Sequence, residues 1–426
     1  MAVADSSLRR DVVCPFCGLA CDDLTVAVEE GRVIVRDGGC DAGRVGFERQ
    51  IPDATPLVAG REAGLDAAVA KAADVLRASR QPLFAGLATD VAGMRAVMQL
   101  AERTGGIVDH AGGDGLFRNL RVVQDSGWMT TTLSEVRNHA DLLLVVGPDP
   151  TAQFPRFFQR CVGPPQTLYT NARPTPQLVR LGPPDGRPVK MWDVAAIELP
   201  CPLDRLPEAV AALRCLVNDR PLRGEEIAGL PVENLGRLAG QLKAARYGVV
   251  SWMAGAFDFA GAELLVQSLA DLVRDLNRTT RCAALPLAGG DNAVGANQVC
   301  TWQSGVPLRT SFAGGAPEHD PLLYRTSRLI GAGEVDALVW VSAFRPLPPP
   351  SAELPTIVIA TPGDAFARPP DVFIPVGTPG IDHAGAIFRT DAVVALPLAA
   401  LRSGGAPSVA DVLARIDRDL SAGGAP

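Results

Sequence analysis

The stretch VVCPFCGLACDDLTVAVEEGRVIVRDGGCDAG, residues 12–43, carries four cysteines with the spacing C-x2-C-x3-C, then eighteen residues, then a fourth cysteine. They are Cys14, Cys17, Cys21 and Cys40. Thiolates are soft ligands, and four of them suit an iron–sulfur cluster or a zinc ion. Zinc sites more often show paired C-x2-C arms, so the spacing favours iron.

Residues 24–37, LTVAVEEGRVIVRD, alternate apolar and polar side chains on both sides of Glu29-Glu30-Gly31. This pattern predicts a β-hairpin. The hairpin lies between the third and fourth cysteines, so it can fold Cys40 back onto the other three. We therefore expect a single four-cysteine site in a small N-terminal domain, with Asp22 and Asp23 capping or hydrogen-bonding its turn.

Beyond residue 60 the chain alternates predicted helices with short apolar strands. Helices are expected at 65–79, 90–103, 132–139, 206–218, 232–245 and 260–277, and strands at 82–87, 106–110, 141–147, 247–253, 335–343, 355–361 and 371–377. Apolar strands separated by helices indicate parallel sheets covered on both faces. The fold class is therefore α/β. The expected domains are the hairpin domain at 1–58, α/β regions at 59–190 and 191–345, and C-terminal strands with a helix at 346–426.

Composition narrows the class of protein. The chain has 426 residues, a net charge of −7 and a pI of about 5.3, and no long basic run that would indicate a nucleic-acid partner. No apolar stretch is long enough for a membrane span, and MAVADSSLRRDVV lacks the apolar core of a secretory signal. We therefore expect no nucleic-acid or membrane partner, and a cytoplasmic location. The remaining cysteines are expected to be buried small hydrophobes, and the four histidines to lie in turns or on the surface.

Three glycine-rich segments follow predicted strands, at 111–115, 287–298 and 376–385. Such turns at the C-terminal ends of parallel strands can present backbone N–H groups to phosphate. None has the P-loop lysine pattern or G-x-G-x-x-G with a well-placed acid, so each alone is a weak signal.

The segment CPFCGLACDD with the later GGC resembles the N-terminus of the B subunit of formylmethanofuran dehydrogenase, a relative of the molybdopterin oxidoreductases. Three further segments resemble the same family: 123–150, 289–307 with FAGGAPEHDP after it, and 371–394. The resemblance implies α/β domains of molybdopterin-oxidoreductase type. It also implies a [4Fe–4S] cluster on Cys14, Cys17, Cys21 and Cys40, and a vestigial pterin loop at Gly289, Gly290, Asp291, Asn292 and Gly295.

The sequence departs from this family at one decisive point. In the family a cysteine downstream of the cluster ligates tungsten or molybdenum, and counting back from Gln124 places it near Gly115, within HAGGDGLFRNL. Glycine supplies no ligand atom, so the resemblance implies that the metal and its pterin are absent. The lysine that several relatives carry after the last cluster cysteine is missing too. We expect Phe117, Arg118 and Asn119 to narrow the old pterin cavity.

This combination most resembles the B subunit of the bacterial formyltransferase/hydrolase complex. There a formyl group passes from tetrahydromethanopterin to a methanofuran-type carrier and is hydrolysed to formate. The implied partners are a formyltransferase subunit, a metallohydrolase-like subunit and a β-helix-type subunit, and the chain itself would be structural, without catalytic residues. Two alternatives stay open: a working pterin oxidoreductase with an unusual metal ligand, and a scaffold with a structural iron–sulfur or zinc site.

Overall fold

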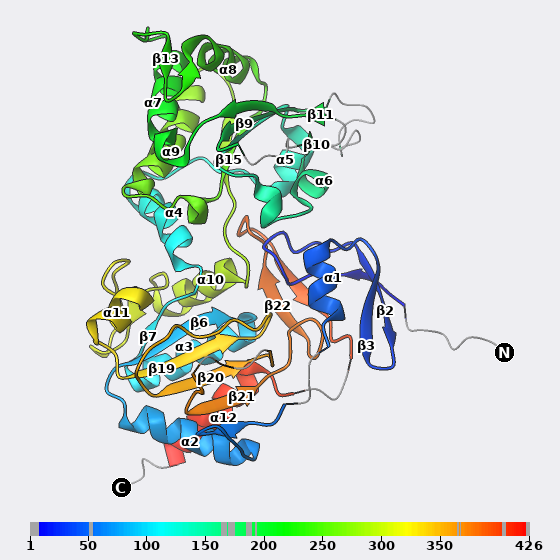
Figure 1. Ribbon diagram of the computed structural model, residues 1–426, viewed down its shortest axis with the longest axis vertical. Helices are drawn as coiled ribbons and strands as arrows, with labels where there is room; N and C mark the ends of the chain where they lie inside the picture. The colour runs from blue at the N-terminus through cyan, green and yellow to red at the C-terminus, as the bar shows by residue number, and fades with distance from the viewer. Residues whose placement is uncertain are drawn as a thin grey trace, which may run out of the picture. The chain divides into compact units, whose positions relative to one another are not determined.

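The chain forms two compact units in the computed structural model, which describes residues 8–50, 54–162, 168, 175–184, 190–191, 194–363, 366, 368–402 and 406–422. The first unit comprises Met1–Gly113 and Gly290–Pro426, and the second comprises Asp114–Gly289. Figure 1 shows the elements of both units.

The N-terminal module of the first unit is a three-stranded antiparallel sheet followed by a helix. Its elements are β1 (Arg9–Val12), β2 (Leu24–Glu29), β3 (Arg32–Asp37) and α1 (Asp41–Glu48). The predicted hairpin is confirmed: its turn residues Glu30 and Gly31 both have positive φ, as a type I′ hairpin turn requires.

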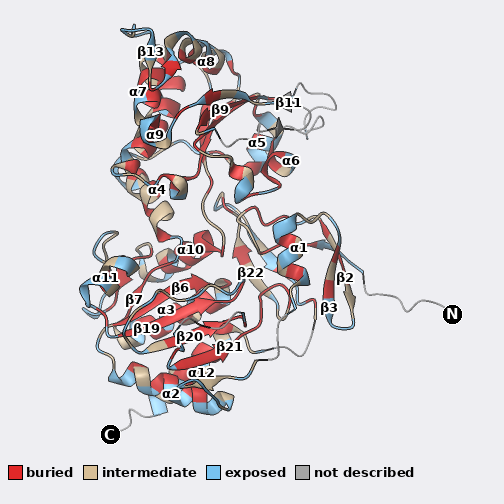
Figure 2. Cartoon of the chain, viewed as in Figure 1, coloured by how far each residue is buried: buried red, intermediate tan, exposed pale blue. Residues whose placement is uncertain are grey.

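The main sheet of the first unit has nine strands in the order β18-β17-β7-β6-β19-β20-β21-β4-β5. Its central strands β7, β6, β19, β20 and β21 are parallel, and both edges are finished by antiparallel pairs. The strands are β4 (Leu57–Val58), β5 (Arg61–Glu62), β6 (Pro82–Ala88), β7 (Ile107–Val108), β17 (Thr310–Ser311), β18 (Glu318–His319), β19 (Ala337–Ser342), β20 (Thr356–Ala360) and β21 (Val372–Pro375). The central strands are buried almost throughout (Figure 2), as their uninterrupted apolar sequences predict.

Helices and a hairpin complete the first unit. They are α2 (Leu65–Ala78), α3 (Val91–Thr104), α10 (Ala293–Ser304), α11 (Thr326–Ala332), α12 (Val409–Ala422), β22 (Gly385–Phe388) and β23 (Ala395–Leu398). Helix α3 begins where the Asp90 side chain accepts a hydrogen bond from Gly93 N, and ends at Gly105 in the left-handed conformation. Both ends therefore follow the usual capping chemistry.

The second unit is built on a five-stranded, fully parallel sheet in the order β12-β9-β8-β15-β16. The strands are β8 (Leu142–Val146), β9 (Gln177–Gly182), β12 (Ile197–Pro200), β15 (Gly248–Trp252) and β16 (Cys282–Pro286). The helices are α4 (Gly113–Ser126), whose first residue belongs to the first unit, α5 (Leu133–His139), α6 (Phe157–Cys161), α7 (Leu206–Val217), α8 (Val232–Ala244) and α9 (Ala262–Leu276). The second unit also contains two short strand pairs: β10 (Lys190–Met191) with β11 (Val194–Ala195), and β13 (Glu226–Ile227) with β14 (Leu230–Pro231). Its three 3₁₀ turns are η1 (Pro150–Ala152), η2 (Leu203–Arg205) and η3 (Ala254–Ala256).

The two compact units differ from the linear division at residues 190 and 345. Position 190 lies inside the second unit and position 345 inside the first. The physical reason is non-local strand pairing: β19 pairs with β6, so the later part of the chain completes a sheet that the early part begins. A local pattern of helices and strands carries no information about which distant strands pair.

Two glycine-rich segments also differ from expectation, because each runs directly into a helix. Helix α4 begins at Gly113, within the segment 111–115, and α10 begins at Ala293, within 287–298. The third segment, 376–385, stays largely irregular until β22. In the described residues, no helix is both long and apolar enough to cross a membrane.

Candidate functional site

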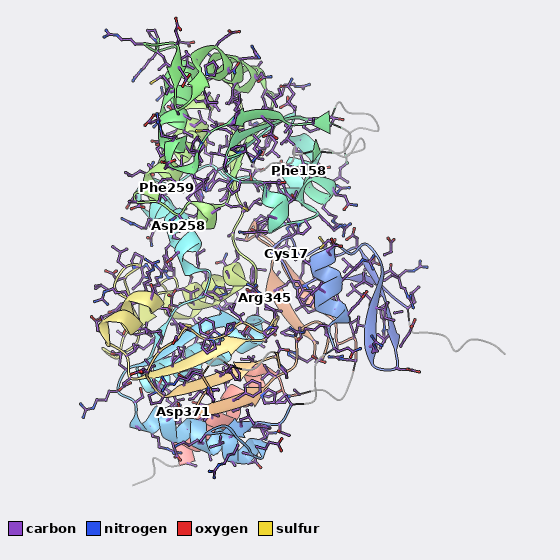
Figure 3. The ribbon with its side chains drawn as sticks, in the orientation of Figure 1. Cys17, Phe158, Asp258, Phe259, Arg345 and Asp371 are labelled. Atoms are coloured by element: carbon purple, nitrogen blue, oxygen red, sulfur yellow. The ribbon has the colours of Figure 1, made fainter. Side chains whose placement is uncertain are left out.

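The loop that carries the first three cysteines folds tightly on itself. Cys14 N donates to Cys21 O at 2.8 Å, and Ala20 N donates to Cys17 O at 3.2 Å. Cys14 and Cys21 are buried, and Cys17, labelled in Figure 3, is half-buried. The C-x2-C-x3-C spacing therefore forms one compact turn.

Cys40 reaches this module because Gly38 permits a close return of the chain. Gly38 has a φ of +74°, and a Cβ there would lie 2.4 Å from Asp23 O, so only glycine fits. Cys40 then caps α1, where its Sγ accepts a hydrogen bond from Gly43 N at 3.4 Å. The Cβ position of Gly43 is 3.5 Å from Cys14 Sγ and 3.7 Å from Cys40 Sγ. Gly43 therefore lies within van der Waals distance of two of the four sulfurs.

Electrostatics also link the four thiols. Burial raises the pKa of the Cys14 thiol well above its ordinary value, and negative charge on Cys17, Cys21 and Cys40 raises it further. Within the described ranges, no three His, Cys, Asp or Glu side chains form a group that could hold a metal ion. The assignment of the four cysteines as ligands stays a prediction.

The cysteine loop is anchored to the rest of the first unit. Thr390 N donates to Gly18 O at 2.7 Å. Buried side chains from the loop and its approach also pack in one apolar cluster with residues of β6, β22 and β23 and with Phe344: Val13, Ala20, Ala88, Phe344, Ile387 and Leu398. The module is therefore part of the first unit's core.

The predicted pterin loop, residues 289–295, begins in the second unit and continues into the first. The side chains of Asp291 and Asn292 form hydrogen bonds with residues of the first unit. The carboxylate of Asp291 accepts hydrogen bonds from Arg345, which is labelled in Figure 3, with Nε 3.0 Å from both oxygens and Nη2 2.6 Å from Oδ2. This pairing raises the pKa of the Arg345 guanidinium. The Asn292 amide donates to Thr89 O at 2.9 Å and accepts from Phe388 N at 2.9 Å.

His110 lies beside this loop and corrects the expectation that the histidines lie in turns or on the surface. It is 3% exposed, and burial lowers its pKa below the ordinary value. Its Nδ1 accepts from Gly112 N at 2.8 Å, and its Nε2 lies 3.2 Å from Asp291 O. Because Nδ1 is the acceptor, the neutral ring carries its proton on Nε2 and donates to Asp291 O.

A buried ion pair that no sequence pattern indicated lies at the end of β7. Asp109 Oδ1 accepts from Arg309 Nε at 3.1 Å, and Asp109 Oδ2 accepts from Thr326 N at 2.9 Å and Thr326 Oγ1 at 2.8 Å. Both charged side chains are almost fully buried. The pair ties β7 to β17 and to the start of α11.

Gly115, expected at the place of the metal-ligating cysteine, lies in α4 against the backbone of η3. A side chain here would place its Cβ 2.7 Å from Gly255 Cα and 2.8 Å from Gly255 N. Heavy atoms do not approach backbone so closely, so any Cβ at position 115 requires the backbone to move. The residues present therefore do not fit the family's metal–pterin centre, since both the sulfur and the room for it are missing.

The side chains that follow Gly115 reinforce this packing within the second unit. Arg118 Nη1 donates to Ala254 O at 3.0 Å, and Asn119 Oδ1 accepts from Trp252 Nε1 at 3.0 Å. Phe117 and Asn119 are buried. That these side chains narrow a cofactor cavity stays a prediction.

The other five cysteines largely follow expectation: Cys161, Cys201, Cys282 and Cys300 are buried, whereas Cys215 is half-buried. Burial raises the pKa of Cys282 to about 12 and that of Cys300 to about 11. Such thiols are inert small hydrophobes.

Comparison with known proteins gives relatives over most of the chain, although no family model matches it. The B subunit of the formyltransferase/hydrolase complex Fhc of Methylorubrum extorquens is 32% identical over 336 residues, covering 78% of this chain and 87% of that protein. The B subunit of the tungsten-containing formylmethanofuran dehydrogenase 2 of Methanococcus maripaludis is 27% identical over 404 residues, covering 90% of this chain and 92% of the relative.

Comparison with solved structures supports the same family. A chain of the formyltransferase/hydrolase complex FhcABCD of Methylorubrum extorquens, crystallised with methylofuran, superposes with a TM-score of 0.75 at 31% identity, covering 87% of this chain and all of that one. Acetylene hydratase of Pelobacter acetylenicus matches with a TM-score of 0.65 at 11% identity, covering 97% of this chain and 69% of that one, which supports the fold alone. The predicted α/β architecture of molybdopterin-oxidoreductase type is confirmed, and the chain belongs to the B-subunit family of formyltransferase/hydrolase complexes and formylmethanofuran dehydrogenases.

Proposed function

We propose that this chain is the B subunit of a formyltransferase/hydrolase complex and that it performs no redox chemistry itself. The single observation that carries the proposal is the packing of Gly115 on Gly255, because the resemblance places the protein ligand of the family's metal–pterin centre at that position. Formyl transfer to a methanofuran-type carrier and hydrolysis to formate need no electron acceptor, so the complex can work without such a centre.

In this proposal the catalytic groups belong to the partner subunits. A formyltransferase subunit moves the formyl group from tetrahydromethanopterin to the carrier, and a metallohydrolase-like subunit releases formate. A β-helix-type subunit is a further proposed partner. The contribution of this chain is to be a scaffold on which they assemble. The similar chain in the FhcABCD crystal structure supports this assignment, since it too belongs to a multi-subunit complex.

We further propose that Cys14, Cys17, Cys21 and Cys40 hold a [4Fe–4S] cluster with a structural role. When bound, such a cluster supplies covalent cross-links between the cysteine loop and the start of α1. The loop is already fixed to the unit's core through Thr390 and Ala20. The links would therefore hold the whole hairpin module in place.

Assembly and activity test the proposed function directly. The chain, co-expressed with the three proposed partner subunits, is expected to co-purify as one complex that transfers and hydrolyses the formyl group. The same complex is expected not to reduce a viologen dye with formate or with the formylated carrier. Dye reduction above the level of a complex lacking this chain would overturn the proposal in favour of a working oxidoreductase.

The close packing at Gly115 predicts opposite effects for two matched substitutions. Gly115→Ala should lower the free energy of unfolding by about 1–3 kcal/mol through overpacking against Gly255. Gly236→Ala, in the interior of α8 with nothing near its Cβ position, should raise it by about 0.5–1 kcal/mol through helix propensity. Urea unfolding monitored by circular dichroism measures both; stabilisation by Gly115→Ala would show that the contact does not exclude a side chain.

Iron analysis tests the cluster. Anaerobically purified protein is expected to contain about four irons per chain and to show a broad visible absorbance. Cys40→Ser should lose both, whereas Cys215→Ser, outside the module, should keep them. An iron-free wild-type protein with a cooperative unfolding transition would refute cluster occupancy without touching the assignment to the formyltransferase/hydrolase complex.

A further inference from the structure

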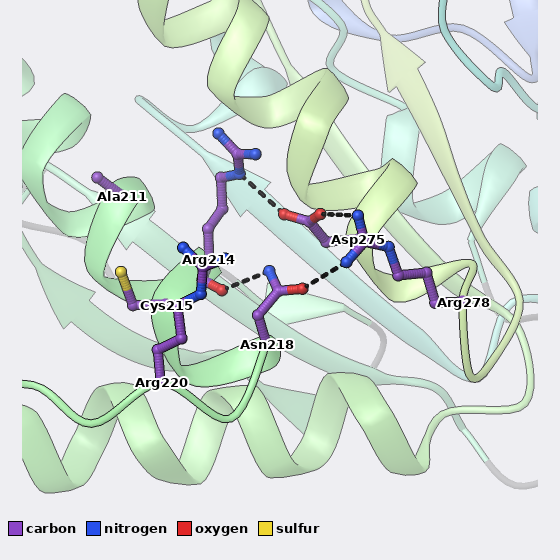
Figure 4. A pocket seen from close by; sticks show the side chains of 7 residues that line it. All are labelled: Ala211, Arg214, Cys215, Asn218, Arg220, Asp275 and Arg278. Carbon is purple, nitrogen blue, oxygen red and sulfur yellow. Dashed lines mark hydrogen bonds and ion pairs between the residues drawn. The ribbon is translucent and has the colours of Figure 1, made fainter.

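A cavity of about 350 Å³ opens on the second unit where the C-terminal ends of α7 and α9 meet (Figure 4). Ala211, Arg214, Cys215, Asn218, Arg220, Asp275 and Arg278 line it. The volume lies at the lower end of the range for small-molecule sites. None of these residues belongs to the cysteine module or to the loops discussed above.

Positive charge predominates in this cavity, since three guanidinium groups face one carboxylate. Arg214 Nε lies 3.0 Å from Asp275 Oδ2, and Arg278 Nη2 lies 3.7 Å from Asp275 Oδ1. Arg214 also pairs with Asp271 outside the cavity lining, at 3.2 Å. Asp275 is thus shared by two arginines, and its side chain is only 7% exposed.

Arg220 is exposed, and no described residue supplies a counter-charge to its side chain. Its backbone N–H donates to Cys215 O at 2.9 Å, which fixes its Cα at the cavity. Its guanidinium makes no hydrogen bond or ion pair with any described residue. A guanidinium presents a planar fork of donors that matches the two oxygens of a carboxylate or phosphate.

The partial negative charge at the C-terminal ends of α7 and α9 does not cancel the excess positive charge of the three arginines. Each helix C-terminus contributes about −0.5 charge. The last carbonyls of α7 already accept hydrogen bonds: Arg214 O from Asn218 N and Nδ2, and Leu216 O from Asp219 N. The net charge in the cavity stays positive. Asn218 Oδ1 accepts from Arg278 Nη1 at 3.1 Å, which holds that guanidinium at the rim.

We propose that this cavity binds the oxyanion of a small ligand, a phosphate or carboxylate group that pairs with Arg220 and lies against the Arg278 guanidinium. The site is separate from formyl chemistry and does not depend on the assigned function. The ligand class follows from the size of the cavity and the charge of its arginines. It is a small anion with two oxygens that can pair with one guanidinium.

Cys215 provides a reporter inside the cavity. Inorganic phosphate is the probe, with sodium chloride at matched ionic strength as the reference. Phosphate at about four times its Kd is expected to slow the alkylation of Cys215 by iodoacetamide about fivefold, because the occupied fraction is protected. Peptide-resolved mass spectrometry on the full-length chain measures the rate, and Cys282, whose buried thiol has a pKa raised to about 12, is the unreactive folding control.

Substitutions of Arg220 test whether its guanidinium binds the phosphate that protects Cys215. Arg220→Gln should abolish phosphate protection, Arg220→Lys should retain part of it, and Arg237→Gln, an exposed arginine on α8 outside the cavity, should retain all of it. Equal protection by chloride, or full protection in Arg220→Gln, would overturn the proposal. Cys215 that is already unreactive in the assembled complex without phosphate would overturn it too, because a partner subunit would then cover the cavity.

Discussion

The contact between Gly115 and Gly255 is the constraint on which the functional account depends. It brings the backbone of α4 against η3 at a distance that excludes any Cβ, and Arg118 and Asn119 fix the same approach through hydrogen bonds to Ala254 and Trp252. A metal-ligating side chain at position 115 would need that helix to move. A cysteine at position 115 is thus incompatible with the present packing of this unit.

In the first unit, the polar side chains of the predicted pterin loop are hydrogen-bonded to the protein itself. The loop after Gly289 that would face a pterin directs Asp291 to Arg345 and Asn292 to Thr89 and Phe388, and His110 donates to the backbone of the same loop. Buried polar groups are costly unless they are paired. Here the protein itself pairs them, so this loop is satisfied without a cofactor. The cysteine module differs from this loop, because the resemblance implies a cluster on its four thiols and that assignment stays a prediction.

The sequence predicted those features that depend on local pattern. The hairpin at 24–37 follows from alternation and a Glu-Gly turn, and the apolar strands at β6, β8 and β19 follow from uninterrupted hydrophobic runs. It did not predict the helical starts of α4 and α10, because glycine-rich segments favour turns. Nor did it indicate the Asp109–Arg309 pair, whose members are 200 residues apart, or the unit boundaries, which depend on the pairing of β19 with β6. The absence of a metal ligand at Gly115 was inferred from the family resemblance alone. Only the structure shows that Gly255 lies too close for a side chain at this position.

Elemental analysis of the assembled complex tests the central claim most directly. The complex should be produced in medium that contains both tungstate and molybdate, so that either metal is available for insertion. Mass spectrometry of the purified complex for tungsten and molybdenum, together with fluorescence detection of oxidised pterin, is expected to find neither in stoichiometric amount. One tungsten or molybdenum per copy of this chain with bound pterin would contradict the account, because the centre would then be present despite the glycine at position 115.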